Sequence, residues 1–417
     1  MPIFADVTSA VAEDWTPTSP SSAATSTSPT SSSSVFGGIL KRINSSYNTP
    51  ELFVNHEAVV KRTNEFINTP IVTMEANNSI CVLQKEACLY PITTTSSTSL
   101  LSSTSSSINN IISNDNTSLS SNTETSNILL PSYIGSTDAT TCSIVFLYGR
   151  PAPGTAPILY QQNTVVAATL VAHVDSANTV ENFISKITDL LKYIPGSGGS
   201  ILNPLELSII GSYDKIQHSR TSEIIVTTLL RLLDKLRLHI RLNIATVWDI
   251  NTKYMDENNN ILNTIPVSPT SPKSITNIKK SGSSTSLASK YRTLPKFTAA
   301  AINIHTGDII PCRFTETSIG PYHILRNAYC WMDNHNLSYI YSLDTQYYVK
   351  PILEKSKFSL DSFTIIYLLS LNDNDFLRKA STSPDAEGPD FVKITKATLR
   401  YILDFLNSAD ENHMVQE

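Results

Sequence analysis

Cys142 stands where a loop of small and hydroxyl residues meets an apolar run. The loop, residues 135–141, reads GSTDATT, and the run that follows, residues 143–148, reads SIVFLY, which predicts a buried strand. Backbone N–H groups of such a loop can converge on the residue at the strand start, where they lower a thiol pKa or bind an oxyanion. Cys142 is therefore a candidate nucleophile, with an inert core cysteine as the alternative.

His173 is the candidate partner of this thiol. It lies in the segment AHVD, residues 172–175, at the end of the next predicted strand, residues 165–174. If the two strands are neighbours, the imidazole can approach the thiol, and a Cys–His pair with a polar third member is the general form of an activated nucleophile. A strand-end histidine that lies at the surface, or whose hydrogen bonds are satisfied within the fold, is the alternative interpretation.

The other histidines lack the spacing of a metal site, so we expect neither a metal nor another cofactor. They are His56, His218, His239, His305, His323, His335 and His413.

Composition and charge exclude several classes of protein. The chain of 417 residues carries 31 basic and 36 acidic side chains, and a net charge of −5 without a basic block argues against nucleic-acid binding. No apolar run reaches the ~18 residues of a membrane span, and residues 1–13 lack the pattern of a signal peptide. Five cysteines without close pairs predict a reducing compartment, so we expect a location in the cytoplasm and also the nucleus.

Alternating strand and helix patterns surround the two candidate residues. A helix is expected over residues 179–193, with Asn178 as its N-cap and Glu181 at the capping-box position. Strands at 205–210 and 242–247 flank an amphipathic helix at 222–236, which predicts a parallel β-α-β crossover. Further expected elements are a hairpin of residues 297–304 and 309–314, a helix at 322–331, strands at 337–341 and 347–349, and a helix at 390–406.

Three tracts rich in Ser, Thr, Asn or Pro interrupt this pattern. Residues 16–34, 93–126 and 256–289 cannot bury enough apolar surface to offset chain entropy, so we expect them to be disordered. The predicted organisation is a mostly disordered segment over residues 1–50 and one domain over residues 51–417 with inserts at 93–126 and 256–289. The predicted fold class is α/β (α+β).

A series of blocks in this chain resembles the protein N-terminal asparagine amidohydrolase family. The block that ends at Cys142 is similar to the family's nucleophile motif, and the segment around His173 is similar to its strand-end histidine segment. The remaining blocks follow in the family's order: VLQKEA (82–87), IIGSYD (209–214), AAINI (300–304) with Thr306-Gly307, and STSP (381–384) with Ala386-Glu387 and PDFV (389–392). Between Cys142 and His173 lie more residues than the family usually shows, and a Pro- and Gly-rich stretch at 149–163 accommodates them.

The resemblance implies a fold and a reaction. It implies mixed β-sheets in a sandwich flanked by helices, similar to the Cys–His deamidases, and a hydroxyl six positions before the cysteine, which is Ser136 here. The implied enzyme is a hydrolase of a linear amide, which converts an N-terminal Asn to Asp and ammonia through a Cys thioester. The implied partners are proteins or peptides that begin with Asn, with the arginyltransferase and ubiquitin machinery of the N-degron pathway acting downstream.

An enzyme that demands an N-terminal residue needs a group that binds the α-ammonium. The candidate carboxylates are Asp138, Asp175 and Glu86. Two other functions stay open: a catalytically silent adaptor that binds N-terminal residues, and a broader protein deamidase acting on Gln or Asn. Intact Ser136, Cys142 and His173 disfavour the adaptor, because an adaptor has no need of all three.

Overall fold

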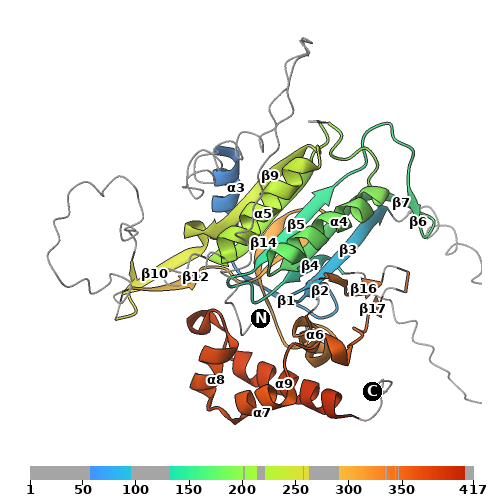
Figure 1. The fold of residues 1–417 in the computed structure, drawn as a ribbon. Helices are drawn as coiled ribbons and strands as arrows, with labels where there is room; N and C mark the ends of the chain where they lie inside the picture. Colours follow the sequence, from blue (N-terminus) through green and yellow to red (C-terminus); the bar gives the residue numbers. More distant parts are fainter. Residues whose placement is uncertain are drawn as a thin grey trace, which may run out of the picture.

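The structure is a computed structural model that describes residues 57–94, 131–200, 202–213, 221–256, 258–262, 291–333, 336–342, 344–345 and 347–408. In it two β-sheets pack face to face, and helices cover the outer face of the larger sheet (Figure 1). This arrangement confirms the predicted fold class, a sandwich of mixed sheets flanked by helices.

The larger sheet contains β5, which begins directly after Cys142, and β7, which contains His173. From one edge to the other its strands are β15 (Ser338–Tyr339), β3 (Glu86–Thr94), β7 (Asn163–Val174), β5 (Ser143–Gly149), β8 (Leu205–Tyr213) and β9 (Ile240–Trp248), and β6 (Leu159–Tyr160) pairs with β7. Every residue of β5 is buried, because one face of the sheet packs on helices and the other on the second sheet. The pairing of β8 with β9 is parallel, as the crossover pattern predicts.

Two helices cover one face of this sheet. They are α4 (Ala177–Tyr193) and α5 (Thr221–Lys235), and their apolar stripes pack on the sheet through residues such as Phe183 and Leu229. The predicted cap of α4 is wrong. Ser176 caps the helix and forms a capping box with Thr179, because the chain turns directly after β7 ends and the short Ser176 side chain reaches the Thr179 N–H.

The second sheet packs on the opposite face. Its strands are, in order, β1 (Val72–Met74), β14 (Ile309–Phe314), β13 (Ala300–Asn303), β4 (Tyr133–Ser136) and β2 (Ser79–Val82). Ile134 and Ile302 of this sheet share an apolar core with Phe146 and Val171 of the larger one. The predicted hairpin is confirmed for β13 and β14, although residues 297–299 lie before the strand.

The remaining strands form two small sheets. A three-stranded sheet projects to one side of the molecule and contains β10 (Thr252–Asp256), β11 (Ile261–Leu262) and β12 (Tyr291–Pro295) (Figure 1). Beside α6, β16 (Tyr341–Ser342) pairs with β17 (Tyr347–Tyr348), so the strand expected at 337–341 is divided between β15 and β16.

The boundaries of the expected disordered tracts need correction. Residues 93–94 end β3, Asp256 ends β10, and residues 261–262 form β11, because backbone pairing with a neighbouring strand compensates for their polar composition. The rest of these two tracts, and the whole of residues 16–34, lie outside the described residues except for residues 258–260, which form the turn between β10 and β11.

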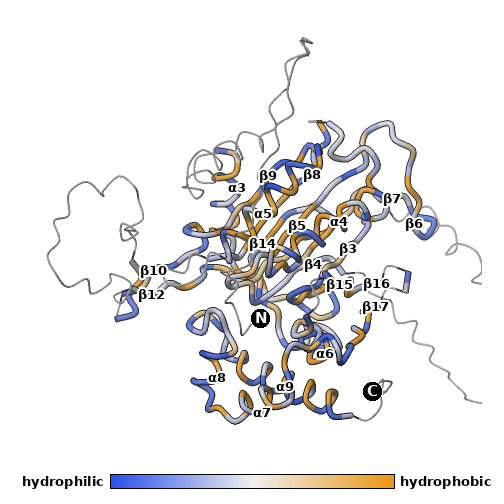
Figure 2. The backbone as a smooth tube through the Cα atoms, in the orientation of Figure 1, coloured by the Kyte–Doolittle hydropathy of each residue, from blue (hydrophilic) through white to orange (hydrophobic). Residues whose placement is uncertain are grey.

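Helices at the C-terminus pack around a core of their own. They are α6 (His323–Cys330), α7 (Ser362–Ser370), α8 (Asp373–Ala380) and α9 (Phe391–Asn407), and Leu368, Phe376 and Leu399 are buried among them. Sequence patterns predict α6 and α9 but miss α7 and α8, as well as α3 (Glu57–Asn68), which packs beside β9. Hydrophobic residues concentrate in the central strands and along the sides of the helices that face one another (Figure 2). No helix within the described ranges is both long and apolar enough to cross a bilayer.

A buried ion pair joins α6 to the start of β3. Arg326 is fully buried, and its Nε and Nη2 donate to the two carboxylate oxygens of Glu86 at 2.9 and 2.7 Å. The guanidinium also donates to the carbonyls of Cys81 and Ile319, both at 2.6 Å. Burial is tolerated because the charges are paired and each of these guanidinium bonds goes to a fixed acceptor. The ion pair therefore ties the C-terminal helices to the sandwich.

Arg326→Met should lower the free energy of unfolding by about 3–5 kcal/mol, since it leaves the Glu86 carboxylate buried without a counter-charge. Urea denaturation measures the change. The matched control is Arg62→Met, which breaks the exposed Arg62–Glu65 pair on α3 and should leave the unfolding free energy almost unchanged. Equal effects of the two substitutions would contradict the role given to the buried pair.

Candidate active site

The register of β5 and β7 places Cys142 beside His173. Ile144 of β5 lies directly opposite His173 of β7, and Cys142 precedes Ile144 by two positions. Because side chains alternate along a strand, Cys142, Ile144 and His173 share the sheet face that packs on the second sheet. Cys142 and His173 are thus diagonal neighbours, close enough for their side chains to interact.

Ser136 reaches the same imidazole from the opposing sheet. It is the last residue of β4, and its Oγ lies 2.9 Å from Nδ1 of His173. All three side chains are buried, with exposed fractions of 0% for Ser136, 2% for His173 and 7% for Cys142. With a proton on Nδ1, the imidazole donates to Ser136 and keeps the Nε2 lone pair as an acceptor, and Nε2 has no hydrogen-bond partner among the described residues.

Burial keeps both members of the Cys–His pair uncharged at rest. Loss of hydration lowers the pKa of His173 to about 4, although the Asp175 carboxylate partly opposes the shift. Burial also raises the pKa of the Cys142 thiol, and the carboxylates of Asp175 and Glu387 raise it further. The pair at neutral pH is therefore a thiol and a neutral imidazole, which suits transfer of the thiol proton to Nε2 during attack.

The loop before β5 presents an amide N–H on the side away from β8. The carbonyl of Thr141 accepts a hydrogen bond from Ser222 Oγ at 3.1 Å, and the carbonyl of Cys142 accepts one from the Ser212 N–H at 2.7 Å. In a trans peptide the C=O and N–H point in opposite directions, so the Cys142 N–H points away from the group that binds the Thr141 carbonyl. This N–H donates to no backbone or side-chain acceptor in the described part of the chain, so it is available to an oxyanion.

Gly211 permits this close approach of β8. A Cβ at Gly211 would lie 2.5 Å from the Cys142 carbonyl oxygen, and its φ of +110° is open mainly to glycine. The next residue, Ser212, also has a positive φ, 47°, and its hydroxyl lies 2.5 Å from that of Ser143. Sequence reasoning included these two residues in the family-like block at 209–214 but assigned them no role, although a Gly directly after the predicted strand at 205–210 was the available signal.

Asp175 lies next to the Cys–His pair and is held as a carboxylate. Gln84 Nε2 donates to its Oδ2 at 2.7 Å and Thr179 Oγ1 donates to its Oδ1 at 3.1 Å. Burial raises the pKa of Asp175, but the Lys85 ammonium together with the hydrogen bonds from Gln84 and Ser176 outweighs burial and holds this pKa below its ordinary value. Asp175 is thus a fixed negative charge beside the thiol.

The other two candidate acids have different surroundings. Both oxygens of Glu86 accept hydrogen bonds within the protein, from Arg326 and from the Leu83 N–H. Asp138 has a left-handed backbone with φ of 60°, and its side chain keeps contact with solvent. Protein atoms around its carboxyl still reduce hydration, which raises the pKa of Asp138. A substrate-binding role for Asp138 or Glu86 stays a prediction.

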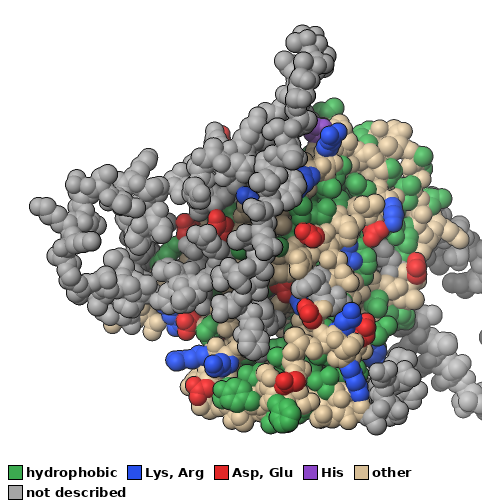
Figure 3. All heavy atoms as spheres, viewed as in Figure 1, with side chains coloured by type: hydrophobic (Ala, Val, Ile, Leu, Met, Phe, Trp, Pro, Cys, Tyr) green, Lys and Arg blue, Asp and Glu red, His purple; other side chains and the backbone are tan. Residues whose placement is uncertain are grey.

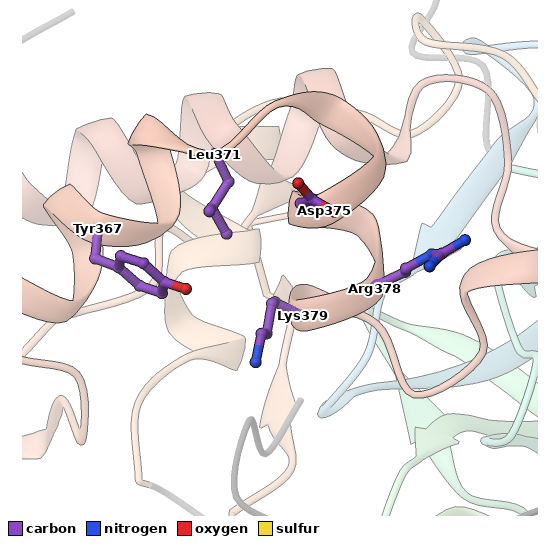
Figure 4. A pocket seen from close by; sticks show the side chains of 5 residues that line it. All are labelled: Tyr367, Leu371, Asp375, Arg378 and Lys379. Carbon is purple, nitrogen blue, oxygen red and sulfur yellow. The ribbon is translucent and has the colours of Figure 1, made fainter.

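A pocket elsewhere on the molecule involves none of these residues. It lies between α7 and α8 and is lined by Tyr367, Leu371, Asp375, Arg378 and Lys379 (Figure 4). Hydrophobic, basic and acidic side chains are interspersed over this part of the C-terminal helices (Figure 3). Within the described residues, no group of three or more His, Cys, Asp or Glu side chains could hold a metal ion.

Comparison with known proteins gives one consistent result. The sequence matches the family described as protein N-terminal asparagine amidohydrolase over residues 123–277 and 273–413. It is also similar to the protein N-terminal asparagine amidohydrolase of Arabidopsis thaliana, with 31% identity over 128 residues. That alignment covers 30% of this chain and 37% of the Arabidopsis protein, so the chain spans little more than a third of that relative.

The depressed pKa of His173 should make folding stability depend on pH. A group with a pKa of about 4 in the folded protein and ~6.5 when unfolded stabilises the fold fully above pH ~6.5, and this contribution is lost as the pH falls towards 4. Between pH 7.5 and 4.5 the wild type should therefore lose roughly 2–3 kcal/mol more unfolding free energy than His173→Gln. Urea denaturation across this range measures it, and parallel pH profiles for the two proteins would refute the shift.

Proposed function

The chain belongs to the protein N-terminal asparagine amidohydrolase family, and on that premise we propose that it hydrolyses the side-chain amide of an N-terminal Asn, giving N-terminal Asp and ammonia. The observation that carries the proposal is the contact between Ser136 Oγ and His173 Nδ1 at 2.9 Å, with Cys142 at the diagonal neighbour position of His173 by strand register. A buried thiol, base and hydroxyl in this order are the parts of an activated nucleophile.

In the acylation step, Sγ of Cys142 forms a bond to the side-chain carboxamide carbon of the substrate. The thiol proton passes to Nε2 of His173, which has no other partner among the described residues. The Cys142 N–H donates to the oxygen that gains negative charge. Collapse of this intermediate breaks the carbon–nitrogen bond, and His173 returns the proton to the leaving nitrogen, so ammonia departs and a thioester remains.

In the second step, water attacks the thioester carbon while His173 takes one of its protons. The carbon–sulfur bond breaks, the proton goes to Sγ of Cys142, and the product is a side-chain carboxylate. Ser136 is bonded to Nδ1 in both steps, where it keeps the imidazole oriented and in one tautomer. A hydroxyl in this place leaves the imidazolium less stabilised than a carboxylate would.

We assign recognition of the substrate α-ammonium to Asp175 ahead of Asp138 and Glu86. Asp175 is ionised and lies two residues after His173, and its charge acts directly on the Cys142 thiol. A substrate without a free α-ammonium, such as an acetylated peptide, would leave this carboxylate without its counter-charge. The bound ammonium would also offset the negative field that raises the Cys142 pKa, so it would favour thiolate formation.

The product defines the place of the reaction in the cell. An N-terminal Asp is the chemical form that arginylation and ubiquitin-dependent degradation act on in the N-degron pathway, and we propose that this enzyme supplies it. All five cysteines are buried free thiols, which fits a reducing compartment and a location in the cytoplasm and nucleus.

Cys142→Ala should abolish ammonia release from an Asn-initiated peptide without unfolding the protein. Glutamate dehydrogenase-coupled detection measures ammonia from Asn-, Gln- and acetyl-Asn-initiated peptides. The matched control is Cys312→Ala, which truncates a cysteine of similar burial in β14 and should retain activity. Residual turnover of one tenth in Cys142→Ala would overturn the nucleophile assignment, and equal rates on the Gln peptide would instead indicate a broader deamidase.

Ser136→Ala should reduce kcat clearly but incompletely, because Ser136 acts only through His173. Ser136→Thr, which keeps the hydroxyl, should retain more activity, and His173→Ala should fall close to the Cys142→Ala background. In the double variant, loss of Ser136 should add little to the loss of His173, because residues that act as a unit are non-additive. Full additivity, measured as single-turnover rates, would place Ser136 outside the catalytic unit.

A further inference from the structure

A segment of the C-terminal part of the chain contacts the loop that carries Cys142. It runs from the end of α8 through the short helix η4 (Pro384–Ala386) and is referred to as the 381–387 segment. Ser383 Oγ lies 2.9 Å from Thr140 Oγ1, and Thr382 Oγ1 lies 3.3 Å from Thr141 Oγ1. Two consecutive residues just before the nucleophile are therefore held by residues more than 240 positions away.

A carboxylate stands at the end of this chain of hydroxyls. Ser383 Oγ lies 3.3 Å from Glu387 Oε1, and the Ser381 hydroxyl donates to the same oxygen. The Ser383 hydroxyl donates to Thr140 Oγ1 at 2.9 Å and also points to Glu387 Oε1 at 3.3 Å, so its single proton is shared between these two acceptors. The Glu387 carboxylate thus holds the hydroxyls of Ser381 and Ser383 together, and the set of Thr140, Ser381, Ser383 and Glu387 is referred to as the relay.

Burial and a second anchor make the relay rigid. Thr140 and Ser383 have exposed fractions of 3% and 0%, so an unpaired hydroxyl at either would be costly. From β12, Arg292 Nη2 donates to the Asp385 carbonyl at 2.6 Å and lies 3.9 Å from the Asp385 carboxylate. The 381–387 segment is therefore fixed on two sides, to the loop before β5 and to β12.

We propose that Ser383 and Glu387 are positioning residues that act through Thr140 to orient the backbone of Cys142. The loop carbonyls are held by Ser212 of β8 and Ser222 of α5, and the relay holds the Thr140 side chain. Together these contacts fix the peptide plane whose N–H faces the oxyanion. The inference rests on the proposed function, because the oxyanion is that of the amide hydrolysis.

An interaction that forms only as charge develops on the oxygen affects kcat more than KM. Removing an oxyanion donor outright costs about 10²–10³-fold in kcat, so loosening the donor's support should cost less, on the order of tenfold. A freed loop should at the same time expose the buried thiol, so alkylation of Cys142 should become faster.

The variants are Ser383→Ala, Glu387→Ala, their double variant and Glu387→Gln. Ser383→Ala and Glu387→Ala should each lower kcat roughly tenfold with KM within about twofold of wild type, and the double variant should resemble either one. Glu387→Gln keeps an oxygen that accepts both hydroxyl protons, so its kcat should stay within about threefold of wild type. The matched control is Ser318→Ala, which removes a buried hydroxyl that donates to the Thr315 carbonyl. Ser318 takes no part in the relay, so this substitution should leave kcat unchanged.

Two readouts separate this inference from the proposed function. Kinetics on an Asn-initiated peptide give kcat and KM, and mass spectrometry gives the rate of Cys142 alkylation by iodoacetamide at pH 8 whether or not the protein releases ammonia. Alkylation at least threefold faster in Ser383→Ala and Glu387→Ala, but not in Ser318→Ala, supports the relay. If the wild type is active and kcat is unchanged in Ser383→Ala and Glu387→Ala, the relay inference is wrong while the proposed function stands. If the wild type is inactive and Cys142 alkylation is also unchanged in these variants, both the relay inference and the proposed function are wrong.

Discussion

The contact between Ser136 and His173 crosses from one β-sheet to the other, and the candidate site depends on the packing that makes this crossing possible. Pairing of β5 with β7 already brings Cys142 next to His173 within the larger sheet. The hydroxyl comes from β4 of the second sheet, so it arrives only when the apolar faces of the two sheets meet. The apolar core between the two sheets therefore also holds the His173 imidazole in place.

Burial of this site has a chemical consequence. A pKa of about 4 for His173 and a raised pKa for the Cys142 thiol mean that neither group is charged before substrate arrives. A thiol that stays protonated at rest is protected from non-specific oxidation and alkylation, because the thiolate is the reactive form. The Asp175 carboxylate adds to the effect of burial on the thiol pKa.

Support for the site comes from parts of the chain that carry no chemistry themselves. The Glu86–Arg326 ion pair fixes α6 against the turn that contains Gln84 and Lys85, and this turn contacts Asp175 through Gln84 and the His173 carbonyl through the Lys85 N–H. The 381–387 segment, which follows α8, brings Ser383 to the loop before Cys142. The C-terminal part of the chain therefore contacts both the turn beside His173 and Asp175 and the loop before Cys142, although the C-terminal helices have an apolar core of their own.

Sequence alone determined the elements whose pattern is local: the strands that became β5, β7, β8 and β9, the parallel crossover through α5, and the long helix α9. Its ordered blocks also indicated the family, and with it Cys142, His173 and Ser136 as candidates. Tertiary structure alone decided which polar groups meet, because a pattern of apolar residues encodes the period of an element and not its partner. The cap at Ser176, the close approach at Gly211, and the Glu86–Arg326 pair across 240 residues depend on how finished elements pack. The same holds for the relay between Glu387 and Thr140, because these residues are far apart in the sequence and meet only in the folded chain.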